Sequence, residues 1–482
     1  MRKFDTKVQY LKYKVLREVA RLAWKDELLE HVLDIPQTIV PGKVPTMRCC
    51  VYKERAILGE RVKLAMGGTK EKPDIIQVID IACDDCPASG YDVTDSCRGC
   101  LAHRCEDVCR RGAISFDHNH VAHIDKSKCV ECGQCSKVCP YSAIVNRKRP
   151  CMNACKIKAI SINEEDTTTI DHSKCISCGA CVYQCPFGAI MDKSFILNVI
   201  DMIKKSEDNK KYKVYALVAP AIGSQMSYAK LGQVVSGIKA LGFYTVIEAA
   251  LGADMVAYSE ARELAEKGKL TSSCCPAFVS FVEKNFPEFK DAISSSVSPM
   301  VTTAKLIKHS DPTARVVFIG PCAAKKGEYT LAKTGGMIDS VMSFEELQAF
   351  VDARGIDTTQ QEDTILDNAS YYGRIFAKSG GIAQGVAYVA GKMGFDGVKP
   401  IAMNGIDQCR MQLTLLRAKK ATANFFEGMA CDGGCIGGPL CITHSPRNVV
   451  DVDKYGNEAK EKDIDGSVRL YEMTMQDKKM NE

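Results

Sequence analysis

The residues best suited to chemistry in this chain are its 25 cysteines, most of which stand in closely spaced groups. Two groups have the patterns C-x2-C-x4-C-x3-C and C-x2-C-x2-C-x3-C-P, and they comprise Cys97, Cys100, Cys105 and Cys109, then Cys129, Cys132, Cys135 and Cys139. The second pattern is typical of thiolates that ligate 4Fe–4S clusters, with the fourth cysteine serving the neighbouring cluster. We therefore predict two clusters, one on Cys97, Cys100, Cys105 and Cys139 and the other on Cys109, Cys129, Cys132 and Cys135.

The chain repeats this unit 46 residues further on, which indicates an internal duplication of a ferredoxin-like module. The recurring positions are Cys151, Cys155, Cys175, Cys178, Cys181 and Cys185. The same crossing of ligands assigns a third cluster to Cys155, Cys175, Cys178 and Cys181. Two of the recurring cysteines then lack partners, because the positions 46 after Cys97 and Cys100 are not cysteines. We predict that an upstream pair completes a fourth cluster, made of Cys83, Cys86, Cys151 and Cys185.

Length, composition and charge narrow the class of protein. At 482 residues and 46% hydrophobic content, the chain is long enough for several domains. Its charged N-terminus lacks the apolar segment of a signal peptide, and no apolar run approaches the roughly 18 residues of a membrane span. Clustered cysteines in such a chain indicate metal ligands, and we expect a cytoplasmic protein of anaerobic metabolism. The formal charge of +5 does not indicate nucleic-acid binding, because a cluster held by four thiolates carries roughly −2.

The elements that must position these cysteines fall into five predicted segments. Residues 1–35 have the periodicity of an amphipathic helix that packs on the domains behind it, with a membrane or partner helix as the alternative. Each cysteine-rich half predicts a β-hairpin, a cysteine-bearing loop and a short helix. Apolar strands then alternate with helices, which predicts an α/β domain. The segments are 1–82 (helical or irregular), 83–145 and 146–192 (ferredoxin-like modules), 211–442 (α/β domain) and 443–482 (polar tail).

Three further cysteine stretches lie in the α/β region, where sites form in loops beyond the ends of strands. They are Thr271–Phe278, which contains Cys274 and Cys275; Pro321–Glu328, which contains Cys322; and Glu427–Pro439, which contains Cys431 and Cys435. The glycines of the third stretch would let the backbone approach a bulky inorganic group. Two cysteines cannot complete a four-ligand site, so the partners must come from the other stretches.

Together these stretches, in this order and downstream of ferredoxin-like modules, resemble the three signature motifs of the FeFe-hydrogenases. The likeness extends over about 215–440 and looks closest to a cysteine-rich, monomeric branch of that family. It implies a two-lobed α/β hydrogenase domain that binds an H-cluster, a 4Fe–4S cluster bridged to a two-iron subsite with CO, cyanide and azadithiolate. The resemblance implies Cys275, Cys322, Cys431 and Cys435 as cluster ligands, Cys435 as the bridge, and Lys325, Met429 and Pro321 as cofactor-binding residues.

The resemblance also implies a path for protons. Cys274 would face the two-iron subsite as the last proton donor, while Glu260, Glu263 and Ser294 would carry protons from the surface. Glu260 and Glu263 are three apart on one face of a predicted helix, which suits a relay; a solvated acidic face is the alternative. Glu328 is assigned to the path or to its support.

The chain departs from the usual family pattern near these motifs. Residues that differ from the common ones are Ala277, Phe278, Met300 and Gly320, and the third motif ends Gly-Gly-Pro-Leu-Cys441. Such changes would alter the surroundings of the cofactor, which tune its potential and solvent access. Cys441 and the adjacent pair Cys49 and Cys50 are interpreted as structural thiols, with a ligand or protective role as the alternative for Cys441.

We therefore predict an FeFe-hydrogenase that catalyses the reversible reaction of 2H+ and 2e− to H2. Its four accessory 4Fe–4S clusters would exchange electrons with ferredoxin or a similar carrier, and maturation enzymes would supply the two-iron subsite. We expect neither nucleic acid nor membrane as a partner. The alternatives are a hydrogen sensor, for which no regulatory domain is visible, and a non-catalytic electron-transfer or cluster-assembly protein. Retention of the motif residues disfavours the latter; they are Cys274, Lys325, Glu328 and Met429.

Overall fold

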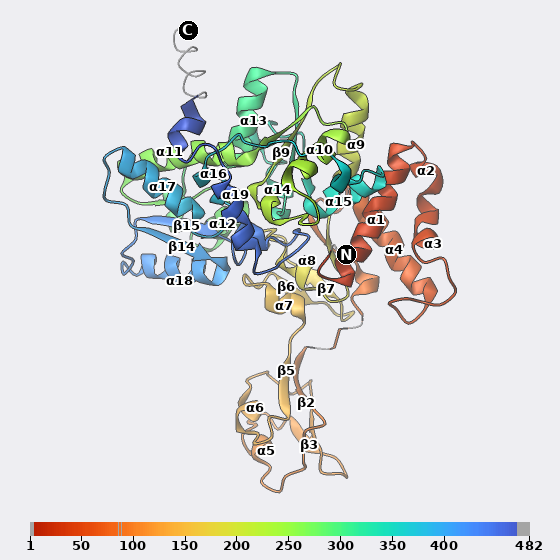
Figure 1. The fold of residues 1–482 in the computed structure, drawn as a ribbon. Helices are drawn as coiled ribbons and strands as arrows, with labels where there is room; N and C mark the ends of the chain where they lie inside the picture. The colour runs from red at the N-terminus through yellow and green to blue at the C-terminus, as the bar shows by residue number, and fades with distance from the viewer. Residues whose placement is uncertain (1–3, 85, 88, 470–482) are drawn as a thin grey trace.

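The computed structural model describes residues 4–84, 86–87 and 89–469, and its N-terminal region is helical (Figure 1). The helices are α1 (Lys7–Trp24), α2 (Leu28–His31), α3 (Ile35–Ile39) and α4 (Val51–Ala65). A capping box between Thr6 and Gln9 starts α1, whose apolar face packs against α15 (Phe344–Ala353). The sequence predicted helix throughout 1–35, but the chain turns at Asp26, whose φ of 64° lies in the left-handed region. α1 therefore ends two residues earlier.

Two ferredoxin-like modules follow, each with a β-hairpin and short helices beside the cysteine-bearing loops. The first contains β2 (Gly90–Val93), α5 (Arg104–Asp107), β3 (Ile114–Phe116), β4 (Ala122–Ile124), α6 (Gln134–Val138) and β5 (Ile144–Arg147). The second contains α7 (Pro150–Ala154), β6 (Ile160–Ile162), β7 (Thr168–Ile170), α8 (Ala180–Gln184) and β8 (Ile190–Asp192). The first module projects away from the molecule, whereas the second packs against the α/β domain (Figure 1). Residues 85 and 88, at the start of the predicted first module (83–145), lie outside the described residues.

The remaining chain forms two lobes, each built on a parallel sheet. One sheet has the order β10-β9-β12-β13, with β9 (Val214–Val218), β10 (Thr245–Glu248), β12 (Arg315–Gly320) and β13 (Ser340–Ser343). The other has the order β11-β15-β14, with β11 (Leu270–Thr271), β14 (Pro400–Asn404) and β15 (Phe425–Met429). Most strands of both sheets are buried, as parallel strands usually are, whereas the edge strand β14 is partly exposed. The fold class is therefore the predicted one, ferredoxin-like modules followed by a two-lobed α/β domain.

Helices cover the faces of these sheets and carry several of the predicted site residues. They are α9 (Ile196–Lys205), α10 (Leu231–Ala240), α11 (Ala249–Lys267), α12 (Pro276–Asn285), α13 (Pro299–Ser310), α14 (Ala323–Glu328), α15, α16 (Tyr371–Ile375), α17 (Gly381–Lys392) and α18 (Gly405–Arg417). Within the described part of the chain, no helix is both long and apolar enough to cross a membrane.

The region predicted as a polar tail is partly folded onto the α/β domain. Helix α19 (Asn448–Asn457) packs against α16 and buries Val452 and Tyr455. The Tyr455 hydroxyl donates to the Glu248 carboxylate, and Arg374 binds the same carboxylate at 2.8 Å. The prediction of a tail beginning at residue 443 is therefore wrong for these residues, because a few apolar side chains among many charges suffice to dock a helix. Residues 470–482 lie outside the described part of the chain.

A buried network of charges joins the N-terminal region, the second module and the α/β domain. Lys326 of α14 contacts Asp192 at 2.7 Å and Glu346 of α15 at 2.8 Å. Lys12 of α1 contacts Asp192 and Glu345, each at 2.5 Å. All five side chains are nearly inaccessible to water, so each carboxylate depends on a lysine for compensation. The network fixes α14, which directly follows Cys322, against its neighbours.

Candidate active site and cluster sites

Four sets of four cysteines line hollows in the ferredoxin-like modules and beside them. The sets are Cys97, Cys100, Cys105 and Cys139; Cys109, Cys129, Cys132 and Cys135; Cys155, Cys175, Cys178 and Cys181; and Cys83, Cys86, Cys151 and Cys185. These are the sets that spacing and counting predicted. All of these cysteines are free thiols, so each set is available to hold one 4Fe–4S cluster.

The set containing Cys83 and Cys86 is assembled by strand pairing. β1 (Ile76–Val78) pairs antiparallel with β8, with Ile76 opposite Asp192. Ile79 N then donates to Ala189 O at 2.7 Å, which brings the chain just before Cys83 beside the chain just after Cys185. Counting cysteines identified the partners, but this pairing is what places them together.

Parallel strands bring the first and third cysteine stretches of the α/β domain together. β11 pairs with β15, with Thr271 opposite Phe426, so both stretches leave the sheet at the same edge. Gly428 N donates to Ser272 Oγ at 3.0 Å. A Cβ at Gly428 would lie 2.3 Å from the Phe278 ring, so only glycine permits this crossing.

The second stretch follows β12 of the other sheet and meets the third through its backbone. Leu440 N donates to Pro321 O at 3.1 Å. A Cβ at Gly438 would lie 2.6 Å from the same carbonyl oxygen, so this approach also requires glycine. The thiols that converge here from both lobes belong to Cys275, Cys322, Cys431 and Cys435.

Without a metal, these four neighbouring thiols are difficult to ionise. Burial, together with repulsion from neighbouring thiolates, raises the pKa of Cys322 to about 11 and that of Cys435 to about 12. Four thiolates at this place therefore need a cationic centre, which the iron of a 4Fe–4S cluster supplies. Gly434 has a φ of 86°, and a Cβ there would lie 2.7 Å from Ser379 N, so the loop lies close against its surroundings. The residues present fit the predicted cluster.

The hollow lined by the third set of cysteines adjoins this site. A cavity of about 710 Å³ is lined by the third set of cysteines and also by Cys431. Cys178 lies close enough to Cys275 and Cys431 for their thiolates to repel one another. The third set of cysteines is therefore the one that lies next to the cysteines of the α/β domain.

Lys325 and Glu328 form an ion pair beside these thiols. The Lys325 Nζ to Glu328 Oε2 distance is 2.6 Å, and both side chains are buried. Burial lowers the pKa of Lys325, but Glu328, with smaller effects from the Cys322 and Cys274 thiols, more than offsets this and raises the pKa above its usual value. Glu328 thus keeps the ammonium group charged, which favours the supporting role over a place in the proton path. Met429, 2% exposed, ends β15 at the same edge.

The predicted proton-path residues lie together beside Cys274. Glu260 and Glu263 both project from α11 and are 0% and 8% exposed, so they do not form a solvated acidic face. Glu260 Oε1 accepts a hydrogen bond from Ser273 N at 3.1 Å, and its Oε2 has no hydrogen-bond partner within the described residues. Ser294 Oγ donates to Glu263 Oε2 at 3.0 Å. These titratable and hydroxyl groups lie near one another and near Cys274, as the predicted proton path requires.

Three family models match this chain in the order expected from its motifs. Residues 212–439 match the iron only hydrogenase large subunit, C-terminal domain; residues 96–143 match a 4Fe-4S dicluster domain, and residues 168–191 a 4Fe-4S binding domain. This protein is FeFe-hydrogenase-like. Iron–sulfur clusters and an H-cluster are the cofactors of this family, and the converging cysteines described above are available to hold them.

Named hydrogenases are similar to this FeFe-hydrogenase-like chain over much of its length. It is 28% identical to the periplasmic [Fe] hydrogenase large subunit of Nitratidesulfovibrio vulgaris, covering 67% of this chain and 86% of that protein. It is 26% identical to iron hydrogenase 1 of Clostridium pasteurianum, covering 53% of this chain and 54% of that protein. The chain therefore spans about half the length of the second relative.

Two further comparisons show a shorter or a weaker similarity. A segment of 91 residues is 34% identical to the cytosolic Fe-S cluster assembly factor NAR1 of Kluyveromyces lactis, 19% of each chain. A solved structure of a variant of apo [FeFe]-hydrogenase HydA1 from Chlamydomonas reinhardtii superposes with a TM-score of 0.47 at 18% identity, covering 57% of this chain and 93% of that chain.

Three residues around this FeFe-hydrogenase-like site were not identified from the sequence. Lys267 contacts Glu263 at 2.7 Å and is partly exposed, so it lies where the predicted proton path would reach the surface. Its spacing of four residues from Glu263 was the signal that could have found it. Ser273 orients Glu260, and Glu427 is fully buried, accepting hydrogen bonds from backbone N–H groups at the start of α17. Burial raises the pKa of Glu427 to about 7.

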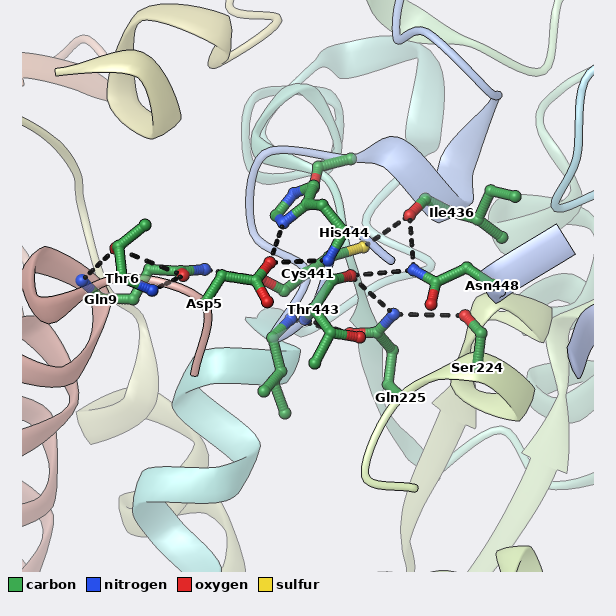
Figure 2. A network of polar contacts seen from close by, with 12 residues as sticks. Asp5, Thr6, Gln9, Ser224, Gln225, Ile436, Cys441, Thr443, His444 and Asn448 are labelled. Atoms are coloured by element: carbon green, nitrogen blue, oxygen red, sulfur yellow. Dashed lines mark hydrogen bonds and ion pairs between the residues drawn. The ribbon is translucent and has the colours of Figure 1, made fainter. Parts of the chain in front are cut away.

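Cys441 belongs to a polar network that ties the third motif to the N-terminus (Figure 2). Its Sγ donates to Ile436 O at 3.4 Å, and its carbonyl accepts from Gln9 Nε2 of α1 at 2.9 Å. Gln225 Oε1 accepts from Ile442 N at 2.7 Å, and Asn448 Nδ2 donates to Thr443 O at 2.9 Å. The Cys441 thiol is thus engaged by the loop backbone, which favours its structural interpretation.

Packing explains some of the positions at which the chain departs from the usual family pattern. Phe278 is fully buried and lies over Gly428. Gly320 lies under the Phe318 ring, since a Cβ there would be 2.6 Å from that ring. Nothing in the structure explains why methionine stands at Met300, which is buried in α13.

Replacing Glu260 by glutamine is expected to flatten the dependence of stability on pH. Burial raises the pKa of Glu260 to about 8, so the folded protein retains a proton that the unfolded chain releases near pH 4.3. The stability from this proton is complete below the unfolded pKa and is lost as pH rises through the folded pKa. Between pH 6 and pH 8 the wild type should lose about 2–3 kcal/mol that Glu260→Gln does not lose.

Denaturation of both proteins at the two pH values measures this difference. Glu266→Gln, at an exposed position of the same helix, is the matched control and should keep the wild-type slope. Equal slopes for wild type and Glu260→Gln would show that Glu260 is ionised in the folded protein.

Proposed function

We propose that this protein catalyses the reversible reaction of two protons and two electrons to H2 at an H-cluster. The observation that carries the proposal is the convergence of thiols from both lobes beside Cys274 and the buried Glu260. The H-cluster would be held by Cys275, Cys322, Cys431 and Cys435. When bound, its two-iron subsite supplies the metal chemistry of hydrogen formation and cleavage.

The residues of the chain would deliver protons, orient the cofactor and exclude water from it. Cys274, held neutral by burial and by the nearby Glu260, would be the last proton donor. Glu260 would pass protons to it from Glu263 and Ser294, whose hydrogen bond is already formed. Lys325 would present a charged N–H donor to an anionic ligand of the cofactor, with Pro321 and Met429 packing beside it.

Electrons would travel through four accessory 4Fe–4S clusters. The first module projects away from the α/β domain (Figure 1), so its two clusters would be the outermost, and the cluster held by Cys178 would lie nearest to that domain. Cys132 is exposed, which supports entry of electrons at the projecting module from ferredoxin or a similar carrier. Maturation enzymes would insert the two-iron subsite. A reducing compartment such as the cytoplasm would keep the cysteines as thiols.

The second candidate function is that of a non-catalytic electron-transfer or cluster-assembly protein. The 91-residue likeness to a cluster assembly factor favours it. A protein that binds only 4Fe–4S clusters has no need for a buried acid chain ending at Cys274, nor for Lys325 beside the thiols. We therefore place hydrogen chemistry first, and slow turnover coupled to sensing remains a variant of that function.

An infrared spectrum of the anaerobic protein matured with the two-iron subsite tests the proposal. Sharp bands of metal-bound CO and cyanide that shift under hydrogen are the expected result, together with hydrogen evolution from a reduced carrier. A protein that takes up iron and sulfide to full 4Fe–4S content, yet shows no such bands, would instead be an electron carrier or assembly factor.

A further inference from the structure

Buried arginines surround the hollow lined by Cys83, Cys86, Cys151 and Cys185. Arg61 of α4 and Arg149 are 2% and 1% exposed. Arg149 Nη1 donates to Cys83 Sγ at 3.8 Å, whereas Arg61 Nη2 donates to Phe187 O at 3.2 Å, two residues after Cys185. Both guanidinium groups therefore lie against the two loops that carry the cysteines.

Arg61 is a buried cation without an anionic partner in the described part of the chain. Its Nε has no hydrogen-bond partner there, and the charged groups that act on it are the Cys185 thiol and another cation, Arg48. The Nε of Arg149 is likewise unpartnered, although its Nη2 is ion-paired with the exposed Asp166 at 2.7 Å, so Arg61 is the arginine that lacks an anion. An unpaired charge in a protein interior is strongly unfavourable. A cluster held by four thiolates, with a charge of roughly −2, supplies the missing counter-ion.

The internal repeat provides a comparison within the same chain. The equivalent hollow of the first module is lined by Cys97, Cys100, Cys105 and Cys139. The positions 46 residues before Arg149 and Thr168 are His103 and Ala122, so the first copy lacks both the guanidinium and the hydroxyl. In the second copy, the Thr168 side chain contacts Cys83 Sγ at 3.2 Å, and Thr168 N donates to the same sulfur at 3.4 Å.

The other hollows have basic neighbours that are exposed. Arg98 and Arg104 lie beside the first hollow, and Arg110 and Arg111 beside the second, all on the surface. Lys284 donates to Cys175 O beside the third and is also exposed. Water and salt screen exposed charges, whereas buried charges act through a medium of lower dielectric constant.

From these contacts we propose that the cluster held by Cys83, Cys86, Cys151 and Cys185 has the highest reduction potential of the four accessory clusters. Reduction adds one electron to the cluster; no bond forms or breaks, and no proton is required because the arginines remain charged. Buried positive charge and hydrogen bonds to the sulfurs stabilise the added negative charge and therefore raise the potential. This inference rests on the cluster assignment of the proposed function and deepens it. The cluster stores the first electron on the way to the α/β domain.

A redox titration of the full chain, loaded with 4Fe–4S clusters but lacking the two-iron subsite, tests the proposal. Electron paramagnetic resonance should show one reduced cluster appearing before the others, and Cys86→Ser should alter that signal. Arg61→Gln and Arg149→Gln should each lower the ratio of reduced to oxidised cluster at least tenfold at a fixed potential, which corresponds to 59 mV. An unchanged ratio in both variants, or a first signal unaffected by Cys86→Ser, would overturn the proposal.

Matched variants separate charge from packing. Arg61→Lys keeps the charge and should retain most of the wild-type potential, whereas Arg104→Gln removes an exposed arginine and should change nothing at this cluster. If Arg61→Gln does not fold, Arg149→His and Thr168→Ala take its place in the test. These variants introduce the residues that the first module has at the equivalent positions, His103 and Ala122. Fewer than four accessory clusters in the wild type would contradict the proposed function. Full iron content with no change of reduction potential in the arginine variants would contradict this inference alone.

Discussion

Replacing Cys274 by alanine is expected to lower hydrogen turnover roughly 10²- to 10⁴-fold, the usual contribution of a positioned proton donor. Cys274 lies next to the buried Glu260 and to Lys325, so its removal interrupts the proposed proton path at the last station. Its neighbour Cys275 has a different proposed task, that of ligating iron. The infrared bands of CO and cyanide and the iron content should therefore remain as in the wild type.

Two further variants make this test specific. Cys275→Ala should lose both iron and activity, so adjacent substitutions would separate proton transfer from ligation. Cys409→Ala removes another thiol that is completely buried and whose Sγ contacts Met429 O at 3.7 Å, yet it should retain its activity. Wild-type turnover in Cys274→Ala would remove this thiol from the path, and loss of the infrared bands would make it a structural residue.

The second large effect is expected on stability, from Lys326→Met. Lys326 is 0% exposed and lies between the carboxylates of Asp192 and Glu346. Its removal leaves two like charges buried with less compensation, which should lower the free energy of unfolding by about 3–5 kcal/mol. Because the network reaches α1 through Lys12, the N-terminal helices should also become more susceptible to proteolysis.

Chemical denaturation of wild type and variant under identical cluster loading measures the effect. Lys205→Met is the matched control, since Lys205 contacts Asp201 at 2.8 Å with both side chains exposed. This surface pair should contribute less than about 1 kcal/mol. An equally small loss for Lys326→Met would mean that the carboxylates become protonated or hydrated when the lysine is absent.

The sequence by itself could predict the cysteine sets because ligand spacing is a local property. Cys129, Cys132 and Cys135 must follow one another closely to bind one cluster, and duplication shows the same spacing again. The hydrogenase-like fold was also predictable, because the three cysteine stretches of the α/β region each have a recognisable local sequence and occur in the expected order. Even the assignment of Cys83 and Cys86 needed only counting.

Tertiary structure alone decided how these groups are surrounded, because burial and charge compensation arise from contacts between distant segments. The β1–β8 pairing places Cys83 beside Cys185, and β11–β15 pairing places Cys275 near Cys431. Glu328 could be assigned to the proton path or its support until its contact with Lys325 was seen. The sequence around Arg61 does not indicate a buried cation. Only the tertiary fold places α4 against the loop that carries Cys185.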